Sequence, residues 1–456
     1  MNKKRLLTFI FSVSIFSAGF AQTWGPLGTG ATSDWGLLTA ATYNNELYVG
    51  GEWFYEAGNV PVNNIARWNG TSWNGVGSGL TGGQNYVAAM CVYQGKLYAC
   101  GSFFAADGLP TNNIAVWDGS QWDTVTTKGL QYCGNGTGWA DAMAIYNGKL
   151  YVAGAFCHAG GIKAENIACW DGTKWDSVSN GINDSVNALA VYNGKLYAGG
   201  QFTRAGKRNV SNIASWDGTK WDTVGTGTNA PVFALQAYSG SLYVGGNFTT
   251  AGVAAHFIAK WNDANWSAVG AGVTGITGVE AFSVFNGKLY VGGLFSKAGA
   301  LTANSIASWN GTAWDTLSTQ GINYNLAALT VYDSALYAAG QFTRAGTSDA
   351  IDVAVWGKVN TSGMNEVANR VEDVLVYPNP GNGKFTFTLS HAELVSASHP
   401  IIELYDIFGK KVFVATLKQV QGDNELNIST EPSGIYFYRI VNESGRVINQ
   451  GKLVKE

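Results

Sequence analysis

The amino-acid sequence predicts an all-β protein: a seven-bladed β-propeller closed by its N-terminal strand, followed by a small Ig-like β-sandwich. Three observations lead to this prediction. The 456 residues include 60 Gly, 17 Trp and 21 Tyr but only 13% charged residues, which is typical of short strands joined by tight turns. A segment of 46 to 53 residues recurs seven times, and a fragment of it, "TWGPLGTG" at 23–30, stands alone before the first copy.

Residues 1–21 are expected to form a secretory signal peptide. They combine a basic start at residues 3–5, an apolar stretch from Leu6 to Phe16, and the small residues Gly19 and Ala21. The apolar stretch is too short to span a bilayer, so we expect no transmembrane segment once the signal is removed. The chain is mildly acidic, with a net charge of −3, and has no Lys/Arg-rich run. This charge pattern argues against nucleic acid or anionic lipid as a partner.

The repeat shows clearly in two aromatic positions. A Leu-Tyr step places tyrosines at Tyr48, Tyr98, Tyr151, Tyr197, Tyr243, Tyr290 and Tyr337. An Ile-Ala-x-Trp step places tryptophans at Trp68, Trp117, Trp170, Trp216, Trp261, Trp309 and Trp356, with Val in place of Ile in the last copy. A period of this length indicates propeller blades.

One repeat, residues 186–225, contains four short runs that alternate apolar and polar residues, as half-buried strands do. Asn193-Gly194 joins the first two runs and Asp217-Gly218 the last two, and both pairs accept the positive φ of a tight hairpin turn. Longer loops join the second run to the third and each repeat to the next. Each repeat is therefore predicted to be a four-stranded antiparallel meander whose long loops share one face.

The isolated fragment at 23–30 matches the end of a repeat, and the last repeat lacks that end. The last repeat stops at Trp356 and has no fourth strand. We predict that the N-terminal strand carrying Trp24 supplies that strand. This pairing closes the ring and leaves no open sheet edge. The propeller is therefore predicted to span residues 22–357.

The recurrent polar and aromatic positions are interpreted as structural. The two Trp of each repeat are expected to pack neighbouring blades together rather than to stack on sugars. A residue that recurs in every blade is expected to serve the packing that all blades have in common. The Asn that precedes Ile-Ala is expected to close a loop by hydrogen bonding. It occurs at Asn64, Asn113, Asn166 and Asn212, with Phe257 and Asp352 as departures.

The repeat resembles the kelch or galactose-oxidase-type propeller repeat over about residues 23–357. The resemblance lies in the order of strands and in double glycines such as Gly50-Gly51 and Gly199-Gly200. Cys100-Gly101 and Ala339-Gly340 depart from it, and the first Trp stands where that family usually has Tyr. The resemblance implies a fold but not a function.

After a polar linker at 358–373, three strand-like segments occupy 374–389, 401–412 and 426–456. They resemble the type A sorting domain of the type IX secretion system of Bacteroidetes over residues 374–456. The matching positions are Pro378, Asn379 and Pro380, then Gly434 and Tyr436 in "SGIYFYRI", and the terminal "GKLVKE". The resemblance implies the type IX machinery as a partner, passage across the outer membrane, and release or attachment at the cell surface. The alternative is a fibronectin-like adhesive module.

The five cysteines permit disulfides in an exported protein, but their odd count leaves one over. Cys157 and Cys169 lie on predicted neighbouring strands of one blade and are the preferred pair. Reduced thiols that act as small apolar fillers are the alternative.

A second local pattern, Asp-Ser/Thr-aliphatic, resembles the O-glycosylation sequon of exported Bacteroidetes proteins. Its acceptor positions are Thr124, Ser177, Ser185, Thr223 and Thr316. The alternative is that Asp and Thr simply occupy a solvated outer strand.

The sequence offers no assembled catalytic site, so we expect no enzyme activity, no cofactor and no metal. Galactose-oxidase copper chemistry needs paired Tyr and His ligands, but only His158 and His256 lie in the propeller. No HExxH, GxSxG or Walker motif occurs. Loop acids leave open a polysaccharide-acting enzyme; they are Glu56, Asp107, Glu165, Asp184, Glu280 and Asp349.

The expected binding surface is the long-loop face, at residues that differ between blades. The longest insertion, 129–143, carries Tyr132 and Trp139. Comparable loops carry Tyr86, Tyr324, Arg204, Arg208 and Arg344. Tyr, Trp and Arg are favoured at binding sites, so we expect an extracellular glycan or protein ligand. A polysaccharide-acting enzyme and a purely structural surface protein are the alternatives.

Overall fold

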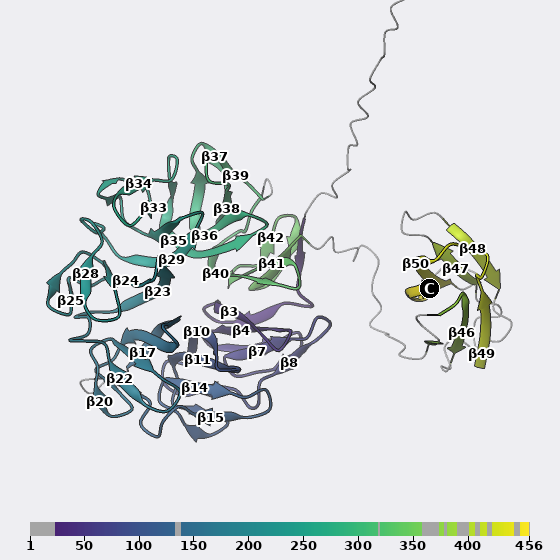
Figure 1. Cartoon of the computed structure of the whole chain (residues 1–456), viewed down its shortest axis with the longest axis horizontal. Coiled ribbons are helices and arrows are strands. Elements are labelled where there is room, and N and C mark those ends of the chain that lie inside the picture. The colour runs from purple at the N-terminus through teal and green to yellow at the C-terminus, as the bar shows by residue number, and fades with distance from the viewer. Residues whose placement is uncertain are drawn as a thin grey trace, which may run out of the picture. The chain divides into compact units, whose positions relative to one another are not determined.

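The computed structural model describes residues 23–132, 138–317, 320–357, 374–377, 381–389, 401–405, 411–416, 422–441 and 447–455. The chain divides into two compact units, residues 1–360 and 361–456. Every regular element of the described residues is a β-strand, as Figure 1 shows. The predicted signal peptide and linker, and the predicted sorting residues Pro378, Asn379 and Pro380, lie outside the described residues.

The first unit contains seven blade sheets, six of four strands and one, in blade 6, of five, which confirms the predicted seven-bladed propeller. Blades 1 to 3 are β3 (Leu37–Tyr43), β4 (Glu46–Gly51), β7 (Ile65–Trp68) and β8 (Trp73–Gly75); β10 (Tyr86–Tyr93), β11 (Lys96–Ser102), β14 (Ile114–Trp117) and β15 (Trp122–Thr124); and β17 (Trp139–Tyr146), β18 (Lys149–Ala155), β21 (Ile167–Trp170) and β22 (Trp175–Ser177). Blades 4 and 5 are β23 (Val186–Tyr192), β24 (Lys195–Gly200), β27 (Ile213–Trp216) and β28 (Trp221–Thr223); and β29 (Val232–Tyr238), β30 (Ser241–Gly246), β33 (Ile258–Trp261) and β34 (Trp266–Ala268).

Blade 6 is β35 (Val273–Phe285), β36 (Lys288–Ala298), β38 (Ile306–Trp309) and β39 (Trp314–Asp315). Blade 7 is β40 (Asn325–Tyr332), β41 (Ala335–Gln341), β44 (Val353–Trp356) and the N-terminal β1 (Trp24–Pro26). The first strands of successive blades contact one another around the ring, and β40 contacts β3. Figure 1 shows these first strands gathered at the centre of the ring.

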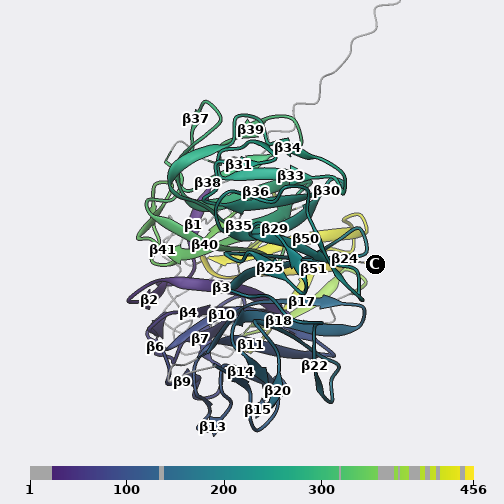
Figure 2. The same cartoon turned by 90° about the vertical axis from the view of Figure 1, so that its left-hand side faces the viewer.

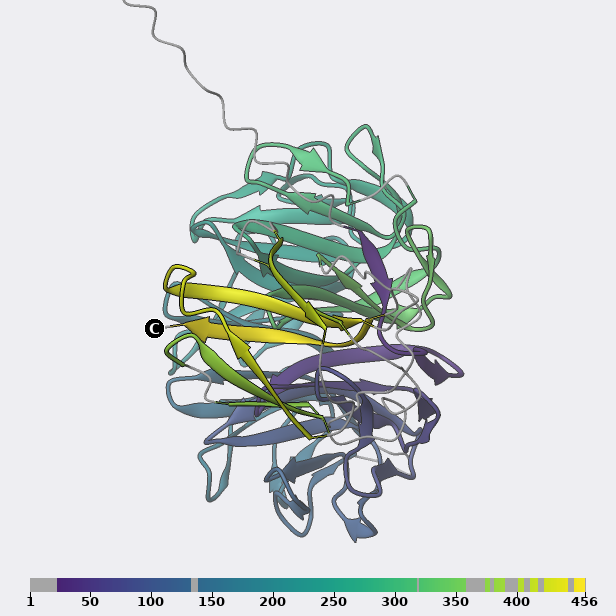
Figure 3. The ribbon, with the colours of Figure 1, turned by 90° about the vertical axis from the view of Figure 1, so that its right-hand side faces the viewer.

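The N-terminal strand closes the ring as predicted. β1 pairs antiparallel with β44, and Trp24 stands opposite Trp356. Both Trp are buried, and their ring centroids lie 5.2 Å apart. Figure 3 shows β1, in purple, beside the green strands of the last blade. The fourth strand missing from the seventh repeat is therefore supplied from the other end of the domain.

The paired tryptophans pack between blades, as predicted. In most blades the indole N–H of the second Trp donates to a backbone carbonyl in the segment that precedes the blade. The donor and acceptor pairs are Trp73 and Leu27 (3.1 Å), Trp122 and Val76 (2.9 Å), Trp221 and Val178 (3.4 Å), Trp266 and Val224 (3.0 Å), and Trp314 and Val269 (3.2 Å). The Nε1 atoms of Trp24 and Trp175 are buried without a hydrogen-bond partner among the described residues.

A second set of hydrogen bonds joins the blades near the opposite face. The Tyr that ends each inner strand donates its hydroxyl to a turn carbonyl of the next blade. The pairs are Tyr43 and Gly95 (3.1 Å), Tyr93 and Gly148 (2.9 Å), Tyr146 and Gly194 (3.0 Å), Tyr192 and Gly240 (2.8 Å), Tyr238 and Gly287 (2.8 Å), and Tyr332 and Asn45 (3.0 Å). Blade 6 has Phe285 at this position and lacks the hydroxyl. We call the contact between two neighbouring blades a seam. The seam between blades 6 and 7 therefore lacks the tyrosine hydroxyl bond, and it also lacks an indole hydrogen bond from Trp24.

The predicted loop-closing asparagines are confirmed. Asn64 and Asn113 are buried, and each accepts a backbone N–H from the loop after its second strand, at 3.2 Å in both cases. In all four blades the Asn Nδ2 donates to the carbonyl of the segment leading to the next blade. The pairs are Asn64 and Leu80 (2.7 Å), Asn113 and Leu130 (3.0 Å), Asn166 and Ile182 (2.8 Å), and Asn212 and Thr228 (2.8 Å). These asparagines hold the two long loops of a blade together.

The second unit contains two sheets. One is formed by β45 (Val374–Tyr377), β46 (Lys384–Leu389) and β49 (Gly422–Asn427), and the other by β48 (Lys411–Thr416), β47 (Ile401–Tyr405), β50 (Gly434–Val441) and β51 (Val447–Lys455). Their shared core includes Phe385, Phe387, Ile402 and Leu404. Of the predicted sorting residues in this unit, Gly434 begins β50, and Tyr436 is buried with its hydroxyl donating to Pro432 O at 2.6 Å.

Candidate ligand-binding face of the propeller

The long loops build one face of the propeller, here termed the long-loop face. The loop after the second strand forms a small hairpin in most blades: β5 (Phe54–Ala57) and β6 (Val60–Pro61), β12 (Ala105–Ala106) and β13 (Leu109–Pro110), β19 (His158–Ala159) and β20 (Ile162–Lys163), β25 (Arg204–Ala205) and β26 (Arg208–Asn209), β31 (Thr250–Ala251) and β32 (Val253–Ala254), and β42 (Arg344–Ala345) and β43 (Ser348–Asp349). In blade 6 the corresponding turn leads from β36 to β37 (Leu301–Thr302).

The segments that link one blade to the next pair with these hairpins. β2 (Ala31–Ser33) pairs with β5, β9 (Leu80–Thr81) with β12, and β16 (Leu130–Gln131) with β19. Figure 2 shows β2, β6, β9 and β13 together on one side of the propeller. The long-loop face is therefore an ordered surface held by backbone pairing.

The exposed aromatic side chains of the propeller lie on this face. Among the described residues of the propeller they are Trp35, Trp53, Tyr55, Phe104, Tyr132 and Tyr324, which are between 43% and 62% exposed. All six belong to linking segments or to loops after second strands. The recurrent Trp and Leu-Tyr positions, in contrast, are buried or half-buried within the blades. Exposed aromatics that do not recur have no packing role common to all blades.

These aromatics are distributed unevenly around the ring. At the entry to the inner strand, blades 7, 1, 2 and 3 carry Tyr324, Trp35, Tyr86 and Trp139, whereas the entries of blades 4 to 6 carry small or polar residues. We call the set on blades 7 to 3 the aromatic arc; it comprises Tyr324, Trp35, Trp53, Tyr55, Tyr86, Phe104, Tyr132 and Trp139.

The structure brings two of the predicted binding residues together. Tyr132 and Trp139 stack with ring centroids 6.3 Å apart and planes 15° apart. Trp139 is half-buried at the start of β17, whereas Tyr132 is 47% exposed. The pair presents a flat platform whose outer surface is Tyr132. Tyr86 is half-buried at the entry of β10, and Tyr324 is exposed at the opposite end of the arc.

Two of these aromatic residues, Tyr86 and Trp139, lie near two acids that were not predicted from the sequence, Asp141 and Glu52. Every inner strand has a register irregularity near its start, and in β17 the residue skipped by the register is Asp141. Burial raises the pKa of Asp141 to about 7, although a hydrogen bond from Trp139 lowers it. Burial also raises the pKa of Glu52, which forms a β-bridge with Tyr86. An acid within an otherwise apolar strand was the signal that could have indicated Asp141.

The arginines predicted for the site are engaged in ion pairs. The Arg204 guanidinium lies 3.4 Å from Glu165, Arg208 lies 3.8 Å from Asp222, and Arg344 lies 3.5 Å from Asp349. None belongs to the aromatic arc. They stiffen the hairpins of blades 4 and 7 on the long-loop face.

The predicted loop acids do not form a carboxylate pair. Glu165 binds Lys163 and Arg204, and the hydrogen bond from Lys163 is the largest cause that lowers its pKa. Glu280 accepts hydrogen bonds from Thr277 and Asn325, both at 2.9 Å. The other four acids, Glu56, Asp107, Asp184 and Asp349, are exposed. Asp107 accepts a hydrogen bond from Ser78 Oγ at 2.8 Å, and Asp184 accepts one from the Ser185 backbone N–H at 2.7 Å. No two of them share a hydrogen bond among the described residues.

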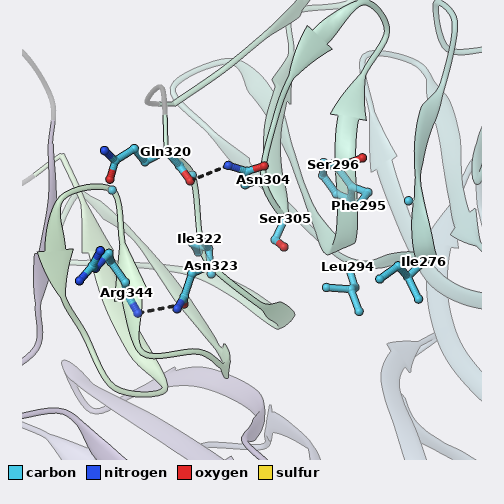
Figure 4. Close-up of a pocket in the computed structure, with 13 residues that line it drawn as sticks. Ile276, Leu294, Phe295, Ser296, Asn304, Ser305, Gln320, Ile322, Asn323 and Arg344 are labelled. Atoms are coloured by element: carbon cyan, nitrogen blue, oxygen red, sulfur yellow. Dashed lines mark hydrogen bonds between the residues drawn. The ribbon is translucent and has the colours of Figure 1, made fainter.

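A cavity of about 590 Å³ opens on the long-loop face between blades 6 and 7. Its walls come from the extended β35–β36 hairpin, the loop that contains Asn304 and Ser305, the linking segment at 320–323, and the blade 7 hairpin with Arg344. Figure 4 shows Leu294 and Ile276 on one side of the cavity, and Ile322 and Asn323 on the other. Of the predicted site residues, only Arg344 lines it.

The predicted disulfide between Cys157 and Cys169 is wrong. Cys169 is a free thiol, whereas Cys157 is disulfide-bonded. The register explains why: Cys169 lies opposite Tyr151, six positions before Cys157. At about 3.3 Å per residue this separates the two cysteines by on the order of 15–20 Å, well beyond disulfide reach.

The five predicted O-glycosylation positions differ in exposure. Ser177 and Thr223 are exposed, and Thr124 and Thr316 are half-buried, all at the outer edges of blades. Ser185 is buried in the segment that enters blade 4. At Thr124, Ser185, Thr223 and Thr316 the preceding Asp accepts a hydrogen bond from the backbone N–H, at 2.7–2.9 Å. The Asp of the pattern therefore already has a local structural role.

The described residues contain no group of three or more His, Cys, Asp or Glu that could hold a metal ion. They also contain no helix with the length and apolarity needed to cross a bilayer.

Residues 375–456 match the family model of the secretion system C-terminal sorting domain. This part of the chain is thus a type IX sorting domain, which directs the protein to export to the cell surface or the extracellular space and to interaction with the secretion machinery. No curated protein matches the chain.

Several solved structures have propeller-like folds similar to this chain. The extracellular domain of the candidate one-component system BT4673 from B. thetaiotaomicron is 13% identical, with a TM-score of 0.48, over 94% of this chain and 58% of that one. PorZ, a surface component of the type IX secretion system of Porphyromonas gingivalis, is 13% identical with a TM-score of 0.41, over 92% and 65%. The designed protein Ika8 is 14% identical with a TM-score of 0.41, over 73% and 99%. This chain spans less than two thirds of the first two.

Proposed function

We propose that this protein is a non-enzymatic binding protein, exported through a cleaved signal peptide and its sorting domain, whose aromatic arc binds an extracellular glycan. The single observation that carries the proposal is the exposure of non-recurrent aromatics on one sector of the long-loop face. Flat aromatic rings bind the apolar faces of sugar rings while the sugar hydroxyls stay hydrated. A kelch-type ancestry of the repeat is part of the same proposal and rests on the order of its strands and on its double glycines.

A glycan fits the arc better than a protein surface does. The arc combines stacked rings such as Tyr132 and Trp139 with neighbouring polar groups, and the nearby arginines are already paired. Protein hot spots combine Trp, Tyr and Arg anchors in fully desolvated pockets, whereas the aromatic arc contains no Arg. Extended rows of separated rings suit a linear chain of sugars instead.

The proposal is tested with the full-length exported protein on a glycan array, followed by calorimetry of any glycan that binds. Binding that is weakened in Tyr132→Ala and unchanged in Val253→Ala is the expected result. Val253 is an exposed residue on the blade 5 hairpin, outside the arc. Binding of no glycan at millimolar concentration, or equal effects of the two substitutions, would overturn it.

One observation favours a second candidate, an exported polysaccharide-acting enzyme. Asp141 and Glu52 both have raised pKa values beside the arc, and a carboxyl group that keeps its proton near neutral pH is suited to general acid catalysis. Release of reducing ends from a polysaccharide that Asp141→Asn abolishes, while glycan binding persists, would select this candidate over the first.

A further inference from the structure

The cavity between blades 6 and 7 lies where other blades are filled by an asparagine. In blades 1 to 4 that asparagine carboxamide connects two loops, and its Nδ2 donates to the carbonyl of the segment leading to the next blade, at 2.7–3.0 Å. Its Oδ1 accepts the backbone N–H of Phe54, Phe103 and Phe156 in blades 1 to 3, at 3.0–3.2 Å. The repeat thus contains a built-in site for one amide group.

Blade 6 has Ser305 at this position, which is too short to span the two loops. Ser305 has φ near 61°, the same left-handed conformation as Asn64 at 62° and Asn212 at 63°. Its side chain lines the cavity, and so does Ile322, the counterpart of the residues whose carbonyls the asparagines bind. No side chain among the described residues donates to the Ile322 carbonyl. The amide position is therefore vacant in blade 6.

In blades 5 and 7, which also lack the asparagine, another side chain makes contacts at this position. Asp352 in blade 7 accepts the backbone N–H of Phe342 at 3.3 Å and the hydroxyl of Ser33 at 2.6 Å. Phe257 in blade 5 packs its ring against the neighbouring core cluster. Only blade 6 combines a truncated side chain with an open cavity among the described residues.

The walls of the vacancy are apolar on one side and polar on the other. Leu294 and Ile276 form one side, and Ile276 is 80% exposed, the most exposed large apolar side chain of the described residues. Gln320 and Asn323 lie on the other side (Figure 4). The one charged side chain in the lining, Arg344, pairs with Asp349 at 3.5 Å. The cavity is therefore suited to a neutral polar group with a small apolar end.

We propose that this cavity binds the N-acetyl group of an amino sugar. The acetamido N–H donates to the Ile322 carbonyl as the asparagine Nδ2 does elsewhere. The acetyl methyl packs against Leu294 and Ile276. A sugar with a plain hydroxyl has no such match. The inference rests on the proposed function and names the class of glycan, because the cavity adjoins Tyr324 at one end of the aromatic arc.

The test compares methyl N-acetyl-β-glucosaminide with methyl β-glucoside as probes of the full-length protein, by ligand-observed NMR and calorimetry. We expect the acetylated sugar to bind at least about 10-fold more tightly, since one amide hydrogen bond and a buried methyl distinguish the two. The acetyl methyl should show the strongest saturation transfer. Equal affinities for the two glycosides would overturn the inference.

Two variants locate the effect. Ser305→Asn restores the asparagine of the other blades at a φ that Asn accepts, so it should fold normally and lower the affinity for the acetylated sugar to that of the glucoside. Ile276→Ser, at an exposed position, should weaken binding severalfold, whereas the matched control Leu301→Ser on the same blade should not. A preference for the acetylated sugar that survives Ser305→Asn would overturn the inference.

The outcomes separate this inference from the proposed function. Glycans that bind through the aromatic arc without any preference for N-acetyl groups contradict the inference and leave the function intact. Binding of neither glycoside, together with an empty glycan array, contradicts both.

Discussion

Trp24 and Trp356 pair within the last blade, although one lies in the first strand of the propeller and the other in its last strand. Their contact is a buried aromatic pair inside an antiparallel sheet, with Ser348 Oγ donating to the Trp24 carbonyl at 3.0 Å. The same pairing closes blade 7 and the ring. The stability of the whole propeller therefore depends on a strand of three residues.

Removing that contact should destabilise the propeller. Trp24→Ala deletes a buried ring and loosens β1, at a cost of about 3–5 kcal/mol in the free energy of unfolding. Denaturant titration of the full-length protein, followed by Trp fluorescence, measures the loss. Trp35→Ala, at a residue 62% exposed, is the matched control and should change stability by less than about 0.5 kcal/mol. Similar losses in both variants would show that β1 does not close the ring.

The seam between blades 6 and 7 should gain stability from a single hydroxyl. Phe285→Tyr supplies the donor that six other inner strands direct at the next blade, and it should add about 0.5–1.5 kcal/mol to the free energy of unfolding. The reciprocal change, Tyr238→Phe, removes such a bond, 2.8 Å long, from the seam between blades 5 and 6 and should cost a similar amount. Both values come from chemical denaturation. Destabilisation by Phe285→Tyr would mean that the seam has no space for the hydroxyl.

The buried carboxyl of Asp352 should make stability depend on pH. Burial raises its pKa from 3.8 to about 6, so the folded state holds the proton more tightly than the unfolded state does. The stabilisation is complete below about pH 4 and is lost as the pH rises through 6, by up to about 3 kcal/mol. Asp352→Asn should remove this dependence and raise the melting temperature at pH 7.5. Thermal melts from pH 4 to 8 measure it, with the exposed Asp349→Asn as the control that should keep the wild-type profile.

The aromatic arc makes a prediction about binding rather than stability. Tyr132→Ala exposes the face of Trp139 but removes half of the platform, and it should weaken glycan affinity by about 1–2 kcal/mol, or about 5- to 30-fold. Calorimetry with a glycan identified on the array gives the affinity, and circular dichroism verifies the fold. An unchanged affinity would exclude the platform from the site.

Recurrence explains what could be predicted from the sequence. The blade count, the closing role of Trp24 and the hydrogen bonding of Asn64 repeat a common pattern, so each copy supports the others. The sorting domain was predictable because several of its motifs follow one another in the expected order. Residues that occur in only one blade have no equivalent copies to support a prediction about them.

The misses follow from this difference. The Cys157–Cys169 pair was wrong because neighbouring strands do not ensure matching positions along them, and the register separates the two thiols. Asp141 was missed because it lies on a strand, whereas the search for acids was confined to loops. Trp53 and Tyr55 carry a readable signal, since the aligned repeats place no aromatic at those positions in blades 3 to 7.

The order of synthesis determines when the pair of strands that closes the ring, β1 and β44, can form. β1 is synthesised first and its partner β44 last among the strands of the propeller. Until β44 is made, β1 has no partner strand, and an unpaired strand is the kind of surface that associates with other chains. The ring can therefore close only after the whole propeller has been synthesised.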